Sequence, residues 1–171
     1  MDLADTSLHE SVHAVAALAL GRRVRWARVA VRPVPGRDDI VEEGAVSFDR
    51  DGVIDRRDII AVLAPGLFEG SRVAWDSGSS VFGVWPPLYE TLGLDAEGDR
   101  GEVSKIVRLL GLSAKEYDDV IREARELLAK PELQLWIAKV AAALAREGHL
   151  TGAEVEALRP DRLTVELQEA A

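Results

Sequence analysis

The chain contains no cysteine among its 171 residues. Disulfides, thiolate nucleophiles and cysteine-ligated zinc or iron–sulfur sites are therefore excluded. Aromatic residues are also few, at 5%. The longest uninterrupted apolar run, Ala14 to Leu20, is much shorter than the roughly 18 residues that a membrane-spanning helix needs. Any chemistry must come from histidines, carboxylates, hydroxyls or a cofactor.

Basic residues are outnumbered, with 21 Lys and Arg against 30 Asp and Glu and a formal net charge of −9. Nucleic acids and anionic membranes select for basic surfaces, so we expect no nucleic-acid partner and no membrane insertion. The first residues, Met1 to Asp5, are acidic where a secretory signal is basic, which favours a cytoplasmic location. The length suits one compact domain over residues 1–171.

Hydrophobic periodicity predicts an α+β, mainly helical fold: a helix bundle with a small N-terminal β-sheet. The expected elements, in order, are a helix ending at Gly21, short strands within 24–49, a helix over 55–76, an irregular loop over 78–94 and helices over 97–158. Pro65 interrupts the second helix, and we expect a kink or a break there. Thr151 and Glu154 form a capping-box pattern that opens a last short helix.

The first predicted helix carries the most informative motif, His9-Glu10-Ser11-Val12-His13. Residues four apart lie one turn above each other on a helix, so both imidazoles can reach one ion. Zinc accepts two such nitrogens, and a glutamate that directly follows the first histidine can act on a water beside the metal. The chain has three histidines, and two of them fall at this spacing.

A catalytic zinc also needs a third protein ligand and an open position. The motif lacks the downstream Gly and third His of the metzincins, so this ligand comes from elsewhere in the chain. From the residues alone, five candidates stay open: Asp99, Asp95, Glu69, Asp76 and His149.

Three stretches together resemble the FtsH-type zinc peptidases. The motif and the Leu18-Ala19-Leu20-Gly21 that follows it look like that family's motif helix. Asp99 and the apolar residues after it match the register of the Asp that supplies the family's third zinc ligand. Residues 144–155 are similar to the family's closing turn and last helix. The middle stretch, Ala64 to Glu69, departs from the family pattern.

The resemblance implies a zincin-like fold and a zinc metalloendopeptidase of the HExxH type. Zinc would be held by His9, His13 and Asp99, with Glu10 as general base for a zinc-activated water. The family's ATPase module and membrane anchor are not in this sequence, so we expect short peptides or unfolded segments as substrates. A homo-oligomer and a separate ATPase partner both stay open.

Substrate binding needs an extended peptide laid across the metal, and an exposed strand edge provides this most simply. The run Gly44-Ala45-Val46-Ser47-Phe48 is the predicted edge, with an inner strand paired on both sides as the alternative. The Trp85–Tyr89 stretch is a second candidate for lining the cleft.

A second hypothesis of another class is a catalytically silent zinc-binding module of the same fold, with a regulatory or protein-interaction role. The altered Ala64–Glu69 stretch motivates it. The ligand set would be the same in both hypotheses, so sequence does not separate them.

Overall fold

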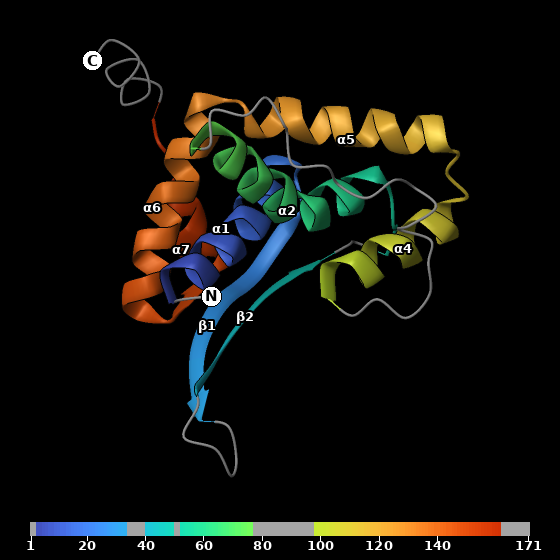
Figure 1. Cartoon of the computed structure of the whole chain (residues 1–171). Coiled ribbons are helices and arrows are strands. Elements are labelled where there is room, and N and C mark those ends of the chain that lie inside the picture. The colour runs from blue at the N-terminus through green and yellow to red at the C-terminus, as the bar shows by residue number, and fades with distance from the viewer. Residues whose placement is uncertain (1–2, 34–39, 50–51, 77–97, 162–171) are drawn as a thin grey trace. The chain divides into compact units, whose positions relative to one another are not determined.

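A computed structural model describes residues 3–33, 40–49, 52–76 and 98–161 (Figure 1). The chain divides into two compact units, Met1–Asp49 with Ala129–Ala171, and Arg50–Leu128. The first unit contains α1 (Leu3–Ala19), β1 (Arg23–Pro33), β2 (Ile40–Asp49), α6 (Pro131–Glu147), β3 (His149–Thr151) and α7 (Gly152–Ala157), and the second contains α2 (Arg56–Asp76), α4 (Gly98–Leu110) and α5 (Ala114–Leu128). The predicted α+β, mainly helical class is confirmed.

The three strands form one antiparallel sheet in the order β2-β1-β3. β1 and β2 make a long hairpin, in which Val29 lies opposite Gly44 and Ala27 opposite Val46 (Figure 1). The short β3 pairs with the other side of β1, placing Leu150 opposite Ala27. Within the described part of the chain, β2 therefore pairs on one side only.

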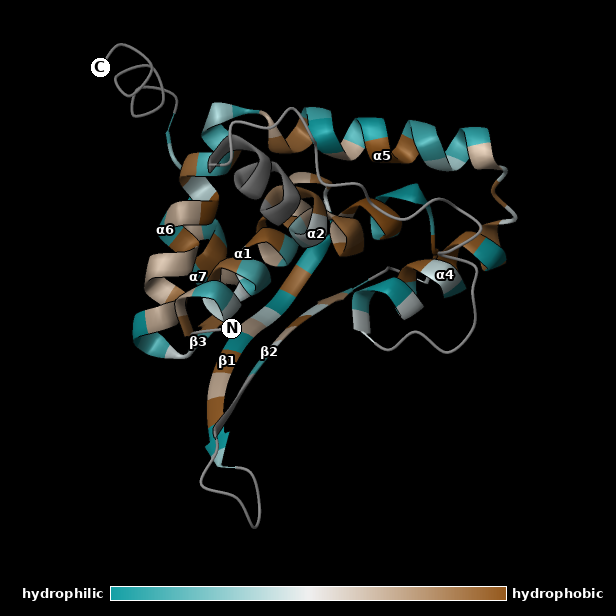
Figure 2. Cartoon of the chain, viewed as in Figure 1, coloured by the Kyte–Doolittle hydropathy of each residue, from teal (hydrophilic) through white to brown (hydrophobic). Residues whose placement is uncertain are grey.

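A register shift in β1 explains which residues face the core. Pairing with β2 is interrupted between Val24 and Trp26. An extra residue in one strand changes the face of every residue that follows. Val24, Ala27 and Val29 are accordingly all buried although the first two are three residues apart. Figure 2 shows the alternating hydrophobic and hydrophilic bands along this strand.

The sheet differs from the sequence prediction in two respects. β2 begins at Ile40, four residues before the predicted Gly44, because Glu42 and Glu43 concealed its alternation. A charged residue is tolerated in a strand when a neighbouring strand supplies the opposite charge. Here Arg32 Nε lies 3.1 Å from Glu43 Oε2. The third strand, β3, comes from the region predicted to be wholly helical, so the sheet is not built from the N-terminal segment alone.

α1 is the most deeply buried element of the first unit. Val12, Val15 and Ala16 have no solvent exposure, and α1 packs against α6 and both long strands. The hydroxyls of Ser7 and Ser11 donate to backbone carbonyls one turn earlier, each at 2.6 Å. Ser7 therefore lies inside the helix and is not its cap.

α7 and α6 close the first unit at its C-terminal end. The predicted capping box is confirmed, with Thr151 and Glu154 bonded reciprocally at the start of α7. Gly152 is required there by close packing, since a methyl group at this position would overlap the Val24 carbonyl. Trp136 is a core residue, and its indole N–H donates to the Val155 carbonyl at 2.8 Å.

The second unit is helical throughout its described part. α2 continues through Pro65, so of the kink and the break expected there the break is wrong, and the kink stays a prediction. The residues preceding the proline, from Ile59 to Ala64, are buried and secure the helix by packing. α5 is amphipathic, with Tyr117, Val120 and Ala124 buried and charged residues along the rest of its surface (Figure 2). No described helix is long and apolar enough to cross a membrane.

Candidate metal and catalytic site

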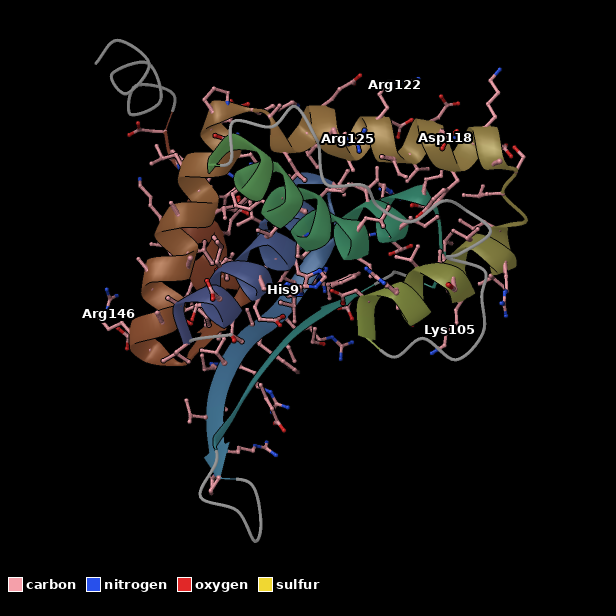
Figure 3. The ribbon with its side chains drawn as sticks, viewed as in Figure 1. His9, Lys105, Asp118, Arg122, Arg125 and Arg146 are labelled. Atoms are coloured by element: carbon pink, nitrogen blue, oxygen red, sulfur yellow. The ribbon has the colours of Figure 1, made fainter. Side chains whose placement is uncertain are left out.

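The two histidines of the motif lie side by side on α1. Their ring centroids are 5.0 Å apart and the rings are nearly perpendicular, at 77°. His13 is buried and His9 is half-buried, projecting from the helix as Figure 3 shows. Adjacent imidazoles of this kind form the start of a tetrahedral metal site, because both side chains point the same way from consecutive turns.

α1 can hold these side chains rigidly because of what lies on its other face. Val12 and Val15 are fully buried in the first unit's core, so the helix cannot rotate without exposing them. Glu10 is 7% exposed, and this low exposure places its carboxylate among packed neighbours and not in bulk solvent. A buried carboxylate needs polar or charged partners.

Glu10 lies directly against β2, at Gly44. A methyl group built on Gly44 would overlap the carboxylate and the Cγ of Glu10. The strand can therefore pass this close to the glutamate only because the residue there has no side chain. This contact joins two predictions that the sequence could not connect: the general base and the first residue of the substrate strand.

The register of the sheet shows which backbone groups of β2 face its open edge, the side on which no described strand pairs with it. Val29 donates its N–H to Gly148 at 2.8 Å, on the β3 side of β1. Successive residues of a strand direct their polar groups to opposite sides, so those of Arg28 face β2. Ala45, opposite Arg28, faces β1 in return, whereas Gly44 and Val46 direct their N–H and C=O groups to the open edge.

Asp99 lies in the first turn of α4, in the second unit, and is half-buried. A helix N-terminus favours a negatively charged side chain such as this one. His9 and His13 offer two imidazoles in the first unit, and Asp99 offers a carboxylate in the second. The donor chemistry fits zinc, which accepts histidine nitrogen and aspartate oxygen together.

The other candidate ligands are placed as follows. His149 begins β3 and is exposed. Glu69 and Asp76 belong to α2, but their side chains lie outside the described residues, as does Asp95. The Trp85–Tyr89 stretch also lies outside the described residues.

Sequence reasoning missed one feature beside this site, a pocket of about 250 Å³ lined by Arg28, Ala30, Arg32, Glu43 and Gly44. A signal for it exists in the sequence, where five arginines and no acid occur between residues 22 and 32.

No protein-family model matches the chain, and no curated protein matches it either. The resemblance to the FtsH-type peptidases therefore stays a prediction.

Proposed function

We propose that this chain is a zinc-dependent metalloendopeptidase that hydrolyses peptide bonds in short or unfolded polypeptides. One observation carries the proposal: the buried Glu10, on the helix that presents His9 and His13, lies against Gly44 at the open edge of a sheet. A base, a pair of imidazoles and a strand edge for an extended peptide are the parts that such a reaction needs.

The ligands in this proposal are His9, His13 and Asp99, whose donor types suit zinc. Zinc, when bound, supplies Lewis acidity that activates water and polarises the scissile carbonyl. Asp99 as the third ligand is supported by its position at the start of α4 and by the resemblance to the FtsH-type family.

Glu10 is the proposed general base. Its carboxylate would accept a proton from the attacking water at one oxygen and deliver it to the nitrogen of the departing amine. Its contact with Gly44 supports this role, because a peptide added to the β2 edge would then pass beside the carboxylate. Burial also holds the carboxylate in one position, which avoids an ordering cost during the reaction.

The peptide would bind as a fourth strand along Gly44 to Phe48. The outward N–H and C=O groups of Gly44 and Val46 would pair with its backbone. Backbone pairing demands no particular sequence, which suits unfolded substrates. We keep a cytoplasmic location within the proposal, supported by the absence of cysteine.

The test is cleavage of a peptide library by purified protein with and without added zinc, read by mass spectrometry. We expect zinc-dependent cleavage by the parent chain and by His149→Ala, which removes the one histidine outside the motif. Glu10→Gln should keep the metal and lose cleavage by about a hundredfold or more, the usual contribution of a general base. Metal binding without cleavage by the parent chain would instead favour the silent zinc-binding module.

A further inference from the structure

The strand next to the proposed substrate edge is strongly basic in an otherwise acidic chain. The net charge of the whole sequence is −9, yet residues 22–32 hold five arginines and no acidic residue. Two of these arginines, Arg28 and Arg32, lie on the outer face of the hairpin and line the pocket of about 250 Å³ noted above, which we call the Arg28 pocket. Positive charge concentrated in a recess attracts anionic groups.

In the described part of the chain, Arg28 is held in place by an aromatic ring and not by a carboxylate. Its guanidinium carbon lies 5.0 Å from the centre of the Trp26 ring, two residues earlier on the same face. A flat cation over an indole is stabilised by the ring and loses little freedom on binding. Among the described residues, no acidic side chain forms an ion pair with Arg28, so its fork of N–H donors is available to a ligand.

The second arginine of the pocket is partly engaged. Arg32 contacts Glu43 through its Nε atom at 3.1 Å, and both side chains are more than half exposed. A guanidinium has five N–H donors, so this single contact leaves others available. Two arginines and one glutamate give the pocket a net charge of +1, which favours an anionic ligand over a cationic one.

The Arg28 pocket adjoins the proposed path of the substrate. Gly44 lines it, and Gly44 is also the residue that contacts Glu10. Residues opposite each other in a sheet share a face, so Arg28 and Ala45 are on the outer face of the hairpin. A peptide residue opposite Ala45 would lie about 10 Å from the Arg28 backbone, two strand spacings away. The Ala45 side chain between them is small, so the long side chain of Arg28 and a long acidic side chain of the peptide can meet over it.

We propose that the Arg28 pocket binds a carboxylate of the peptide substrate and gives the peptidase a preference for peptides that offer a carboxylate there. This inference rests on the proposed function and specifies its substrate class. The carboxylate belongs either to an internal glutamate or to the peptide's C-terminus, since both offer the same bidentate partner to a guanidinium.

The test measures binding and not cleavage, and it uses the zinc-loaded Glu10→Gln chain so that the peptides stay intact. Three fluorescein-labelled peptides of one length are compared by anisotropy: one with an internal glutamate and an amidated C-terminus, one with glutamine and a free C-terminus, and one with glutamine and an amidated C-terminus. We expect one of the first two to bind about three- to fivefold more tightly than the third at low salt, the range of an exposed ion pair. Which of the two gains affinity identifies the source of the carboxylate.

Substitution of the arginine locates the effect. Arg28→Gln should abolish the preference while leaving the affinity for the uncharged peptide unchanged. Arg23→Gln, which removes the same charge from an exposed position on β1 outside the pocket, should keep the preference. The preference should also shrink as salt rises from 0.05 to 0.5 M by the ordinary screening of exposed charges.

Equal affinities for the three peptides, no binding of any of them, or a preference that survives Arg28→Gln would overturn the proposal. Charge-selective binding by Glu10→Gln together with no cleavage by the parent chain would distinguish the two proposals. The carboxylate-binding role of the Arg28 pocket would then be supported, and the peptidase function would be contradicted.

Discussion

The carboxylate of Glu10 and the backbone of Gly44 occupy adjoining space that a single methyl group would fill. α1 and β2 come from opposite ends of the N-terminal segment, and the sheet brings them together. The contact makes β2 a part of the candidate site and not only a part of the fold. It also makes the smallest possible change of sequence, the addition of one methyl group, a sensitive probe of the site.

Gly44→Ala should reduce peptidase activity at least about tenfold, because its methyl group must displace the Glu10 carboxylate from the position in which a general base acts. Zinc content should stay at the parent value, since neither histidine is touched. The measurements are the initial rate of peptide cleavage and the metal content by elemental analysis.

A double variant provides the control for this effect. If Gly44→Ala acts only through Glu10, then Gly44→Ala combined with Glu10→Gln should be no slower than Glu10→Gln alone. An additional loss in the double variant would show that the methyl group disturbs the site by another route.

The third ligand can be tested by two carboxylate substitutions. Asp99→Ala should lower zinc occupancy severely, because removing one of the three proposed ligands leaves only the imidazole pair. Glu69→Ala should keep its zinc and act mainly on stability. Elemental analysis after reconstitution and dialysis decides the matter: full occupancy in Asp99→Ala with loss in Glu69→Ala would point to a Glu-type zincin and away from the FtsH-type assignment.

The capping box at the start of α7 predicts a pH dependence of folding. The backbone N–H of Thr151, at 2.7 Å, and its hydroxyl, at 2.8 Å, hold the pKa of Glu154 below its ordinary value of 4.5. A depressed folded-state pKa stabilises the fold above the unfolded value, and the contribution is lost as pH falls through the folded value. Glu154→Gln should therefore lower the urea midpoint at pH 7 and make little difference at pH 3.

Glu123→Gln is the matched control for this measurement, because it removes the same charge from an exposed position on α5. Its effect on the midpoint should be small at both pH values. A Glu154→Gln difference as large at pH 3 as at pH 7 would contradict an origin in the ionised carboxylate.

Much of this molecule could be predicted from local patterns. The four-residue spacing of His9 and His13 places their side chains next to each other on any helix. Thr151 and Glu154 form the capping box that their residue types and spacing predict. Helix bounds followed from apolar periodicity, because one turn of a helix depends on neighbours three or four residues away.

What the sequence did not reveal depends on contacts between distant segments. The early start of β2 was concealed because charges such as Glu43 are acceptable only when a neighbouring strand supplies a partner. Continuation of α2 through Pro65 depends on burial, which outweighs the lost hydrogen bond. The approach of Gly44 to Glu10 is a matter of packing between a helix and a strand, and no local spacing encodes it.

The last prediction tests the substrate strand with two prolines at neighbouring positions. Val46 directs its N–H to the open edge of β2, whereas Ala45 directs its N–H to β1. Val46→Pro should therefore keep the β1–β2 ladder, the fold and the zinc, while removing a donor that the proposed substrate peptide would use. Ala45→Pro should disrupt the ladder itself and lower the thermal midpoint by several degrees.

The expected result for Val46→Pro is a rise of about threefold to tenfold in KM, the value of roughly one hydrogen bond, with circular dichroism and metal content unchanged. Proline tolerates the edge of a sheet, so retention of the fold is consistent with this geometry. If Val46→Pro keeps its structure and zinc and still cleaves peptides with the parent KM, the edge of β2 does not carry the substrate. The Trp85–Tyr89 stretch would then be the next place to substitute, since Trp85 and Tyr89 offer the apolar contacts that a peptide bound away from a strand edge would require.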